Sequence, residues 1–162
     1  MGAGSIWQRV VRFFARPHGD VKSFEQEVEA AGVAGRADGG MRIIPAAKIV
    51  GSVGRAQNLR SDFFYKTGKA ITGRFVRIGQ AMQAGTILPP IEVYKAKLPR
   101  KQAGEEKAVT EYYVVDGHHR VAMAKKLGQD YLDAHVVEYR VAAPATPGPK
   151  DAAGPAPDPR PE

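Results

Sequence analysis

The segment from Asp116 to Arg120 combines residue types that bind phosphate and transfer protons. It reads Asp116-Gly117-His118-His119-Arg120. A glycine lets a ligand approach the backbone closely, arginine offers several N–H donors to an oxyanion, and imidazole titrates near neutral pH. This pattern indicates phosphate binding by Gly117, His118, His119 and Arg120. His119 and Asp116 are then the candidates for transferring a proton in catalysis.

A strand, a turn and a helix are predicted to position this segment. Tyr112 to Val115 is a short run of aromatic and β-branched residues, which favours a strand, and Asp116-Gly117 favours a turn. Residues at helical spacing and a closing glycine follow: Val121, Ala124, Leu127 and Gly128. The helix should therefore begin near His118. Its first amide hydrogens have no partner within the helix, and the helix dipole adds a positive potential that favours an anion.

Each of these residues also has a purely structural explanation. Asp116-Gly117 is a common turn sequence, and the aspartate can cap the following helix through its carboxylate. One of the two histidines could cap or pack, and His135 is expected to be structural on a strand. The histidine pair is not favoured as a metal site, because adjacent residues on a helix point about 100° apart. We therefore predict no metal ligands.

The same residues resemble the glycine-x-x-arginine box of the ParB/sulfiredoxin superfamily, in which Gly117 to Arg120 is followed by small residues at 122 and 124. Ile78 to Gly85 and Leu88 to Val93 resemble the helix, glycine, proline-isoleucine and strand that precede the box in that family. Tyr131 to Val137 resembles its closing strand. The likeness covers roughly Met41 to Glu138 and implies an α+β fold, with a small mixed sheet and packed helices.

The resemblance implies a function in nucleotide binding. The Gly-His-His-Arg form is closest to that of free-serine kinases and some stand-alone members of the superfamily. It implies ATP, ADP or CTP as ligand, with Mg²⁺, and a phosphotransferase or nucleoside triphosphatase if the protein is an enzyme. Sulfiredoxins place a cysteine where His118 stands, and this chain has no cysteine, so their thiol chemistry is excluded.

A second likeness is to the partition-type ParB proteins, which usually carry an acid and two arginines in this box. They also have an arginine-bearing loop after their first strand, which Gly54 to Arg60 resembles; Arg60 is therefore a further phosphate-binding candidate. Their activity suggests an alternative function, a non-specific DNA-binding accessory protein. The net charge of +7 suits either polyanion. A basic surface that only aids solubility explains the charge equally well, and no helix-turn-helix is recognisable.

Three regions are predicted along the 162 residues. Residues 1–40 should form a helical extension and linker: an amphipathic helix over Ser5 to Phe14, a second helix over Val21 to Ala31 capped by Asp20, and the glycine-rich Gly32 to Gly40. The first helix could pack on its own domain or bind a membrane surface or a protein partner. Residues 41–140 should form the ParB/sulfiredoxin-like domain. Residues 141–162, rich in proline and alanine, should be disordered.

Within residues 41–140 we predict strands at Arg42 to Ile44, Ile91 to Lys95 and Leu132 to Val137. A helix over Ala70 to Ala84 should bury Phe75, Ile78 and Met82, end at Gly85 and leave Arg74 and Arg77 facing solvent. Gly51 to Thr67 should be rich in loops, and Ala96 to Glu111 should be a long mobile loop. We expect a cytoplasmic protein, since no run approaches the length of a transmembrane segment and no signal peptide is recognisable.

Overall fold

A six-stranded mixed sheet organises the described residues, 20–66 and 73–142, of this computed structural model. The strands are β1 (Lys22–Ser23), β2 (Val33–Pro45), β3 (Ile49–Ser52), β4 (Ile91–Gln102), β5 (Glu105–Asp116) and β6 (Tyr131–Val141). The helices are α2 (Gly73–Gln83) and α3 (His118–Leu127), with single turns at η1 (Glu25–Glu29), η2 (Ala46–Lys48) and η3 (Ala56–Asn58). The predicted α+β class is confirmed.

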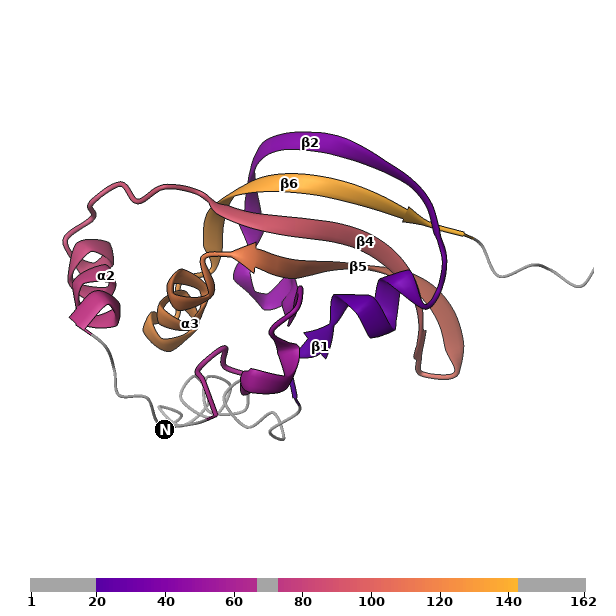
Figure 1. The fold of residues 1–162 in the computed structure, drawn as a ribbon, viewed down its shortest axis with the longest axis horizontal. Coiled ribbons are helices and arrows are strands. Elements are labelled where there is room, and N and C mark those ends of the chain that lie inside the picture. The colour runs from indigo at the N-terminus through magenta and orange to yellow at the C-terminus, as the bar shows by residue number, and fades with distance from the viewer. Residues whose placement is uncertain (1–19, 67–72, 143–162) are drawn as a thin grey trace, which may run out of the picture.

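The strands lie in the order β1-β3-β5-β4-β6-β2. β4 and β5 form an antiparallel hairpin, β2 runs antiparallel to β6, and the remaining neighbours are parallel. α2 and α3 lie beside each other at one end of the sheet, while the tip of the hairpin projects from the other end (Figure 1). The carboxyl ends of the parallel strands β3 and β5 thus lie near the start of α3.

Each face of the sheet has its own hydrophobic core, because alternate residues of a strand point to opposite faces. On one face, Val93, Val114 and Val136 pack with residues from α2 and α3. On the other face, Phe24 and Val28 from the N-terminal turn pack against the strands. The Phe24 ring lies 5.1, 5.5 and 5.0 Å from three tyrosine rings, those of Tyr94, Tyr113 and Tyr139.

The glycine-rich stretch Gly32 to Gly40 is the start of β2 and not a linker. β2 pairs with β6 from Val33 to Pro45, so the boundary expected at residue 40 falls inside a strand. The strand shifts register between Asp38 and Gly40, where Gly40 has φ +68°. Glycine permits this backbone conformation and the bend that goes with it. The predicted strand at Arg42 to Ile44 is part of the same element.

The predicted helix over Val21 to Ala31 is also wrong. The segment forms the short strand β1 and one π-helical turn, η1. Phe24 and Val28 of this segment are both buried. Asp20 caps no helix; it forms an ion pair with Lys66. Lys22 and Ser23 of β1 pair with β3. Because they are in a strand, they cannot form the first turn of the predicted helix.

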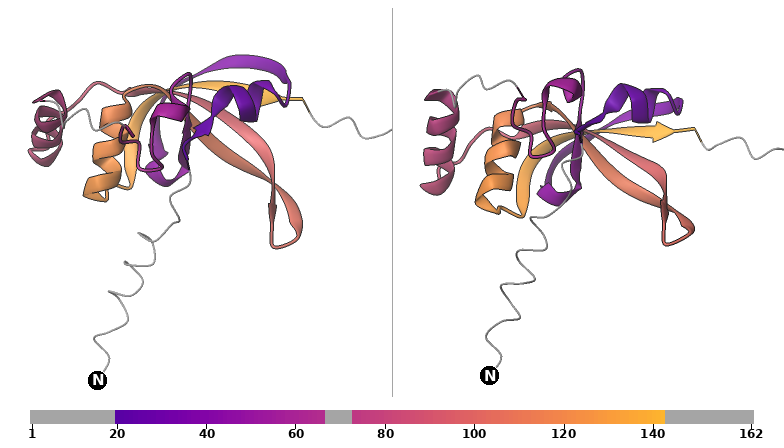
Figure 2. Two further views of the ribbon diagram at one scale, coloured as in Figure 1. Left: turned by 60° about the horizontal axis from the view of Figure 1, so that its bottom comes forward. Right: turned by 90° about the horizontal axis from the view of Figure 1, so that it is seen from below.

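The polar segment Ala96 to Glu111 is an ordered hairpin and not a mobile loop. β4 and β5 remain paired as far as Gln102 and Glu105. Ala103 and Gly104 form the two-residue turn, with φ of 52° and 84°, as the right-handed twist of a hairpin favours. Figure 2 shows the hairpin projecting away from the helices. Its polar sequence reflects exposure to solvent near the tip.

The remaining elements follow the sequence closely. α2 buries Phe75, with Ile78 and Met82 packed against the core, and Gly85 follows with φ +70°. α3 begins at His118 and ends at Leu127, with Gly128 as its C-cap, although Leu127 is 40% exposed and not buried. The predicted helix over Ser5 to Phe14 lies outside the described residues, as does all of the predicted tail beyond residue 142.

None of the helices in the described residues has the length and apolar character needed to span a bilayer.

Candidate functional site

Gly117 joins β5 to α3 in a conformation that only glycine adopts easily. Its φ and ψ are 98° and 24°, in the left-handed region. A Cβ atom at this position would lie 2.6 Å from Ile91 Cγ2, so there is no room for a side chain. The Gly117 carbonyl accepts a hydrogen bond of 3.1 Å from the Val121 amide, which closes the first turn of α3.

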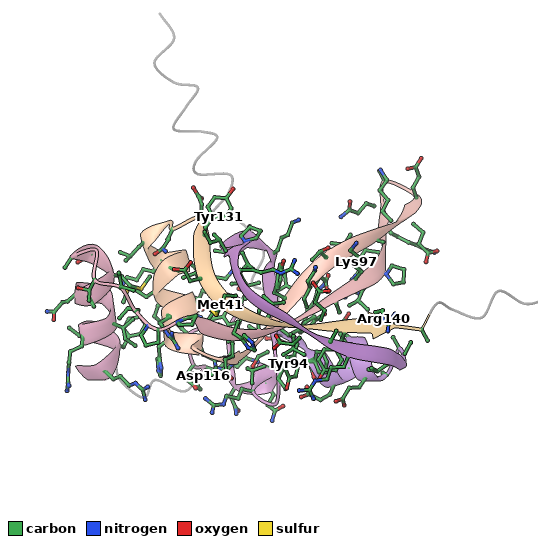
Figure 3. The ribbon with its side chains drawn as sticks, turned by 90° about the horizontal axis from the view of Figure 1, so that it is seen from above. Met41, Tyr94, Lys97, Asp116, Tyr131 and Arg140 are labelled. Atoms are coloured by element: carbon green, nitrogen blue, oxygen red, sulfur yellow. The ribbon has the colours of Figure 1, made fainter. Side chains whose placement is uncertain are left out.

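Asp116 does not cap α3, contrary to the sequence prediction. Within the described residues no side chain caps this helix. The Asp116 carboxylate is 71% exposed, and its Oδ2 lies 3.5 Å from Arg120 Nη2. Figure 3 labels Asp116 at the end of the sheet next to α3. The amide hydrogens of the first helical turn therefore remain for an acceptor other than this carboxylate.

The His118 side chain points into the core. It is 3% exposed, and its Nε2 lies 2.8 Å from Oγ of Ser52, at the end of β3. Burial lowers the pKa of His118 to about 4, helped by the charge of Arg55, while a hydrogen bond to the backbone of Val114 opposes the shift. The ring is therefore neutral near pH 7, and its Nε2 is hydrogen-bonded to the Ser52 hydroxyl. Only the backbone amide of His118 is left for a phosphate.

His119 lies between two aromatic rings and near two arginines. Its ring centroid is 5.8 Å from that of Tyr65 and 6.2 Å from that of Phe75. Burial lowers the pKa of His119, and the charges of Arg74 and Arg55 lower it further. A neutral imidazole at physiological pH can accept a proton, as the sequence prediction for His119 requires.

Arg55 and Arg74 bring positive charge to this site from two other elements. Arg55 Nη1 lies 3.4 Å from the Tyr65 hydroxyl oxygen. Arg74 stands in the first turn of α2, and its charge lowers the pKa of both His119 and Arg120. Arg74 is exposed, as predicted, but no role in the site was predicted for it. The neighbouring Phe75, which was predicted to be buried, packs against His119. Its inward position is the sequence signal that could have placed Arg74 near the site.

Arg120 lies on another side of the helix start. Its side chain is 15% exposed, and Nη1 donates a hydrogen bond to the Pro89 carbonyl oxygen while Nη2 faces Asp116. Burial lowers the pKa of Arg120, the charge of Asp116 opposes this, and that of Arg74 adds to it. The guanidinium lines a cavity of about 280 Å³ together with residues of the loop before β4. A Cβ atom at Gly117 would lie 3.1 Å from Arg120 Nη2, so this charge is beside the glycine.

Arg60 has its contacts within its own segment. Its guanidinium forms an ion pair of 2.8 Å with Asp62 and is 53% exposed, and its backbone pairs with Asp20 and Phe64. In residues 20–66 and 73–142 it makes no hydrogen bond or ion pair with α3.

The three side chains of the predicted box point in different directions. His118 contacts β3, His119 packs against α2, and Arg120 contacts the loop before β4.

No group of three or more histidine, aspartate or glutamate side chains in the described part of the chain is arranged to hold a metal ion.

The sequence matches no known family model and no curated protein. Among solved structures, the chain is similar to a crystal structure of sulfiredoxin from Arabidopsis thaliana. The TM-score is 0.39 and the sequence identity 16%, over 62% of this chain and 86% of the sulfiredoxin chain.

Proposed function

We propose that the N-terminus of α3 binds the phosphate groups of a nucleotide. The observation that carries this proposal is a helix start that no described side chain caps, with the charges of Arg55 and Arg74 on the side of His119 and that of Arg120 beside Gly117. Like charges held close together repel, and the lowered pKa values of His119 and Arg120 reflect that repulsion in part. A bound polyanion would offset it, and the helix dipole would add to the attraction.

Each part of the site has a role in this proposal. The amides of His118, His119 and Arg120 would donate hydrogen bonds to phosphate oxygens, and Gly117 would let the ligand approach the backbone. Arg55 and Arg74 would supply guanidinium groups. Mg²⁺ bound to the phosphates would offset part of their charge. The negative charges of Asp116 and Glu92 act to raise the pKa of Arg120. ATP, ADP and CTP remain the candidate ligands.

An enzymatic function, as a phosphotransferase or nucleoside triphosphatase, would extend this proposal. His119 supports it, because its lowered pKa keeps the imidazole neutral and able to accept the proton of a hydroxyl group or water. Asp116 is the second candidate, because its exposed carboxylate is at the start of the same helix.

The test is nucleotide-dependent thermal stabilisation of the protein and of two arginine variants on one helix. A panel of ATP, ADP, CTP and GTP, each with and without magnesium, should raise the melting temperature for at least one nucleotide, because a ligand that binds only the folded state stabilises it. Arg74→Ala should lower the affinity for that nucleotide by about one to two orders of magnitude, which corresponds to the loss of one charge-assisted hydrogen bond. Arg77→Ala, one turn further along α2, is the matched control and should bind like the wild type.

Two results would count against the proposal. If no nucleotide stabilised the protein at any magnesium concentration, the α3 site would not be a nucleotide site. If Arg74→Ala and Arg77→Ala weakened binding equally, the effect would come from the general charge of the surface.

A further inference from the structure

Positive charge and aromatic rings reach His119 from two other elements of the fold. The segment before η3 contributes Arg55, whose guanidinium contacts the Tyr65 hydroxyl at 3.4 Å. α2 contributes Arg74 and the Phe75 ring, which lies 6.2 Å from the imidazole. On its own helix, His118 is neutral above a pKa of about 4. In the part of the chain that the structure describes, the charges that shift the pKa of His119 are those of Arg74 and Arg55.

We propose that anion binding at the start of α3 is coupled to the uptake of a proton by His119. This inference rests on the proposed function and adds a property to the same site. In the free protein, Arg55 and Arg74 repel a protonated imidazole at this position. An anion bound beside these arginines would remove the repulsion and add an attraction, so that the imidazolium becomes the favoured form. The protonated ring would then have two N–H donors, where the neutral ring has one.

The sign of the coupling follows from linkage. The pKa of His119 is below its ordinary value in the free protein and would be higher in the complex. Between these two pKa values the complex holds more protons than its separated parts, so affinity rises as the pH falls. The rise can reach about tenfold for each pH unit, the limit for one proton. His118 does not contribute near neutral pH, because its pKa is about 4.

The closing experiment counts protons by calorimetry with inorganic tripolyphosphate, which presents the phosphates without a base. Binding enthalpies near pH 6.5 in buffers of different ionisation enthalpy give the number of protons taken up per bound anion. His119→Gln should take up fewer protons than the wild type, by a difference approaching one. His135→Gln removes a histidine of β6 that pairs with Asp38 of β2. This variant should take up as many protons as the wild type. Protons that the ligand itself exchanges cancel in these differences.

A second measurement covers the case in which His119→Gln fails to fold. The ring resonances of His119 in the wild-type protein, followed by NMR against pH, should give a higher pKa with saturating tripolyphosphate than without it. Binding with an unchanged His119 pKa, or with equal proton numbers in His119→Gln and the wild type, would overturn the coupling and leave the nucleotide site intact. Failure of tripolyphosphate to bind would overturn the coupling as proposed for phosphate, and the nucleotide panel decides the proposed function separately.

Discussion

The hydrogen bond between Ser52 and His118 fixes the first turn of α3 to the end of β3. Both side chains are buried, and Ser52 Oγ lies 2.8 Å from His118 Nε2. The pKa of His118 is lowered to about 4, whereas an unfolded chain has an imidazole pKa near 6.5. The unfolded state therefore binds more protons between these pH values. The neutral ring contributes its full stability above about pH 6.5 and loses it as the pH falls towards 4.

Replacing Ser52 by alanine should destabilise the protein by about 1–3 kcal/mol, because it leaves a buried ring nitrogen without its partner. Urea unfolding at pH 7.5 measures the change. Ser61→Ala removes a hydroxyl group from an exposed residue and should change stability by less than about 0.5 kcal/mol. Equal stability of the two variants would show that the buried hydrogen bond contributes nothing.

The place of Gly117 to Arg120 in the fold could be predicted from sequence, but the directions of their side chains could not. Gly117 to Arg120 was placed correctly at a turn before a helix, because glycine and the helical spacing are local signals. That His118 enters the core while His119 meets Phe75 depends on where β3 and α2 pack against α3. Arg74 reaches the site through the same packing, which no local pattern encodes.

At the scale of elements, Glu111 joins the N-terminal segment to the hairpin. Its carboxylate accepts hydrogen bonds from Lys22 at 2.7 Å, from Arg100 at 2.8 and 3.0 Å, and from the Tyr113 hydroxyl at 2.7 Å. Burial alone would raise the pKa of Glu111, but the hydrogen bonds from Arg100, Lys22 and Tyr113 outweigh it and hold the pKa at about 2. Arg100 also pairs with Glu27 of η1. The network thus connects β1, η1, β4 and β5.

Glu111→Gln should destabilise the protein by about 3 kcal/mol at pH 7, because it removes the charge that compensates two cations in a largely buried network. The contribution of the carboxylate is complete above pH 4.5 and is lost as the pH falls towards 2. The difference between wild type and variant should therefore shrink in urea unfolding curves recorded at pH 3. Glu105→Gln, at the exposed pair with Lys107 near the hairpin tip, should have an effect below about 1 kcal/mol at both pH values.

The elements that the sequence predicted best are those with buried residues at a regular spacing. Phe75, Ile78 and Met82 identified α2, and Leu132 to Val137 identified the start of β6. The hairpin and the first half of β2 were missed because their strand signal is weak: one is polar and exposed near its tip, and the other is rich in glycine. In both, pairing with a neighbouring strand supplies the order that the side chains do not indicate.

At the scale of the whole molecule, much of the hairpin's positive charge is already paired. Lys95 contacts Glu138 at 2.9 Å, Arg100 contacts Glu111, and Lys107 contacts Glu105 at 3.4 Å. Lys97, labelled on the projecting hairpin in Figure 3, is exposed. These pairs reduce the charge that the hairpin can offer to a phosphate backbone. The alternative function in DNA binding stays a prediction.

Duplex DNA should therefore bind weakly, at micromolar or poorer affinity, without sequence preference and with a steep loss between about 50 and 200 mM salt. Fluorescence anisotropy of a labelled duplex at these two salt concentrations, with and without competing nucleotide, measures this. Tight and selective binding at physiological salt would reverse our preference for a nucleotide ligand. An absence of binding even at low salt would remove the DNA-binding alternative.

β2 and β6 are neighbours in the sheet, but a ribosome makes them at nearly opposite ends of the described chain. β2 is synthesised early, and its partner in the sheet, β6, is the last of the described strands to emerge. Until then β2 cannot pair with that partner, and Met41 and Ile43, which are exposed even in the folded protein, have no sheet beside them. Contacts between such distant segments slow folding. The outermost pair, Val33 with Val141, can therefore form only after all of the described strands have been made.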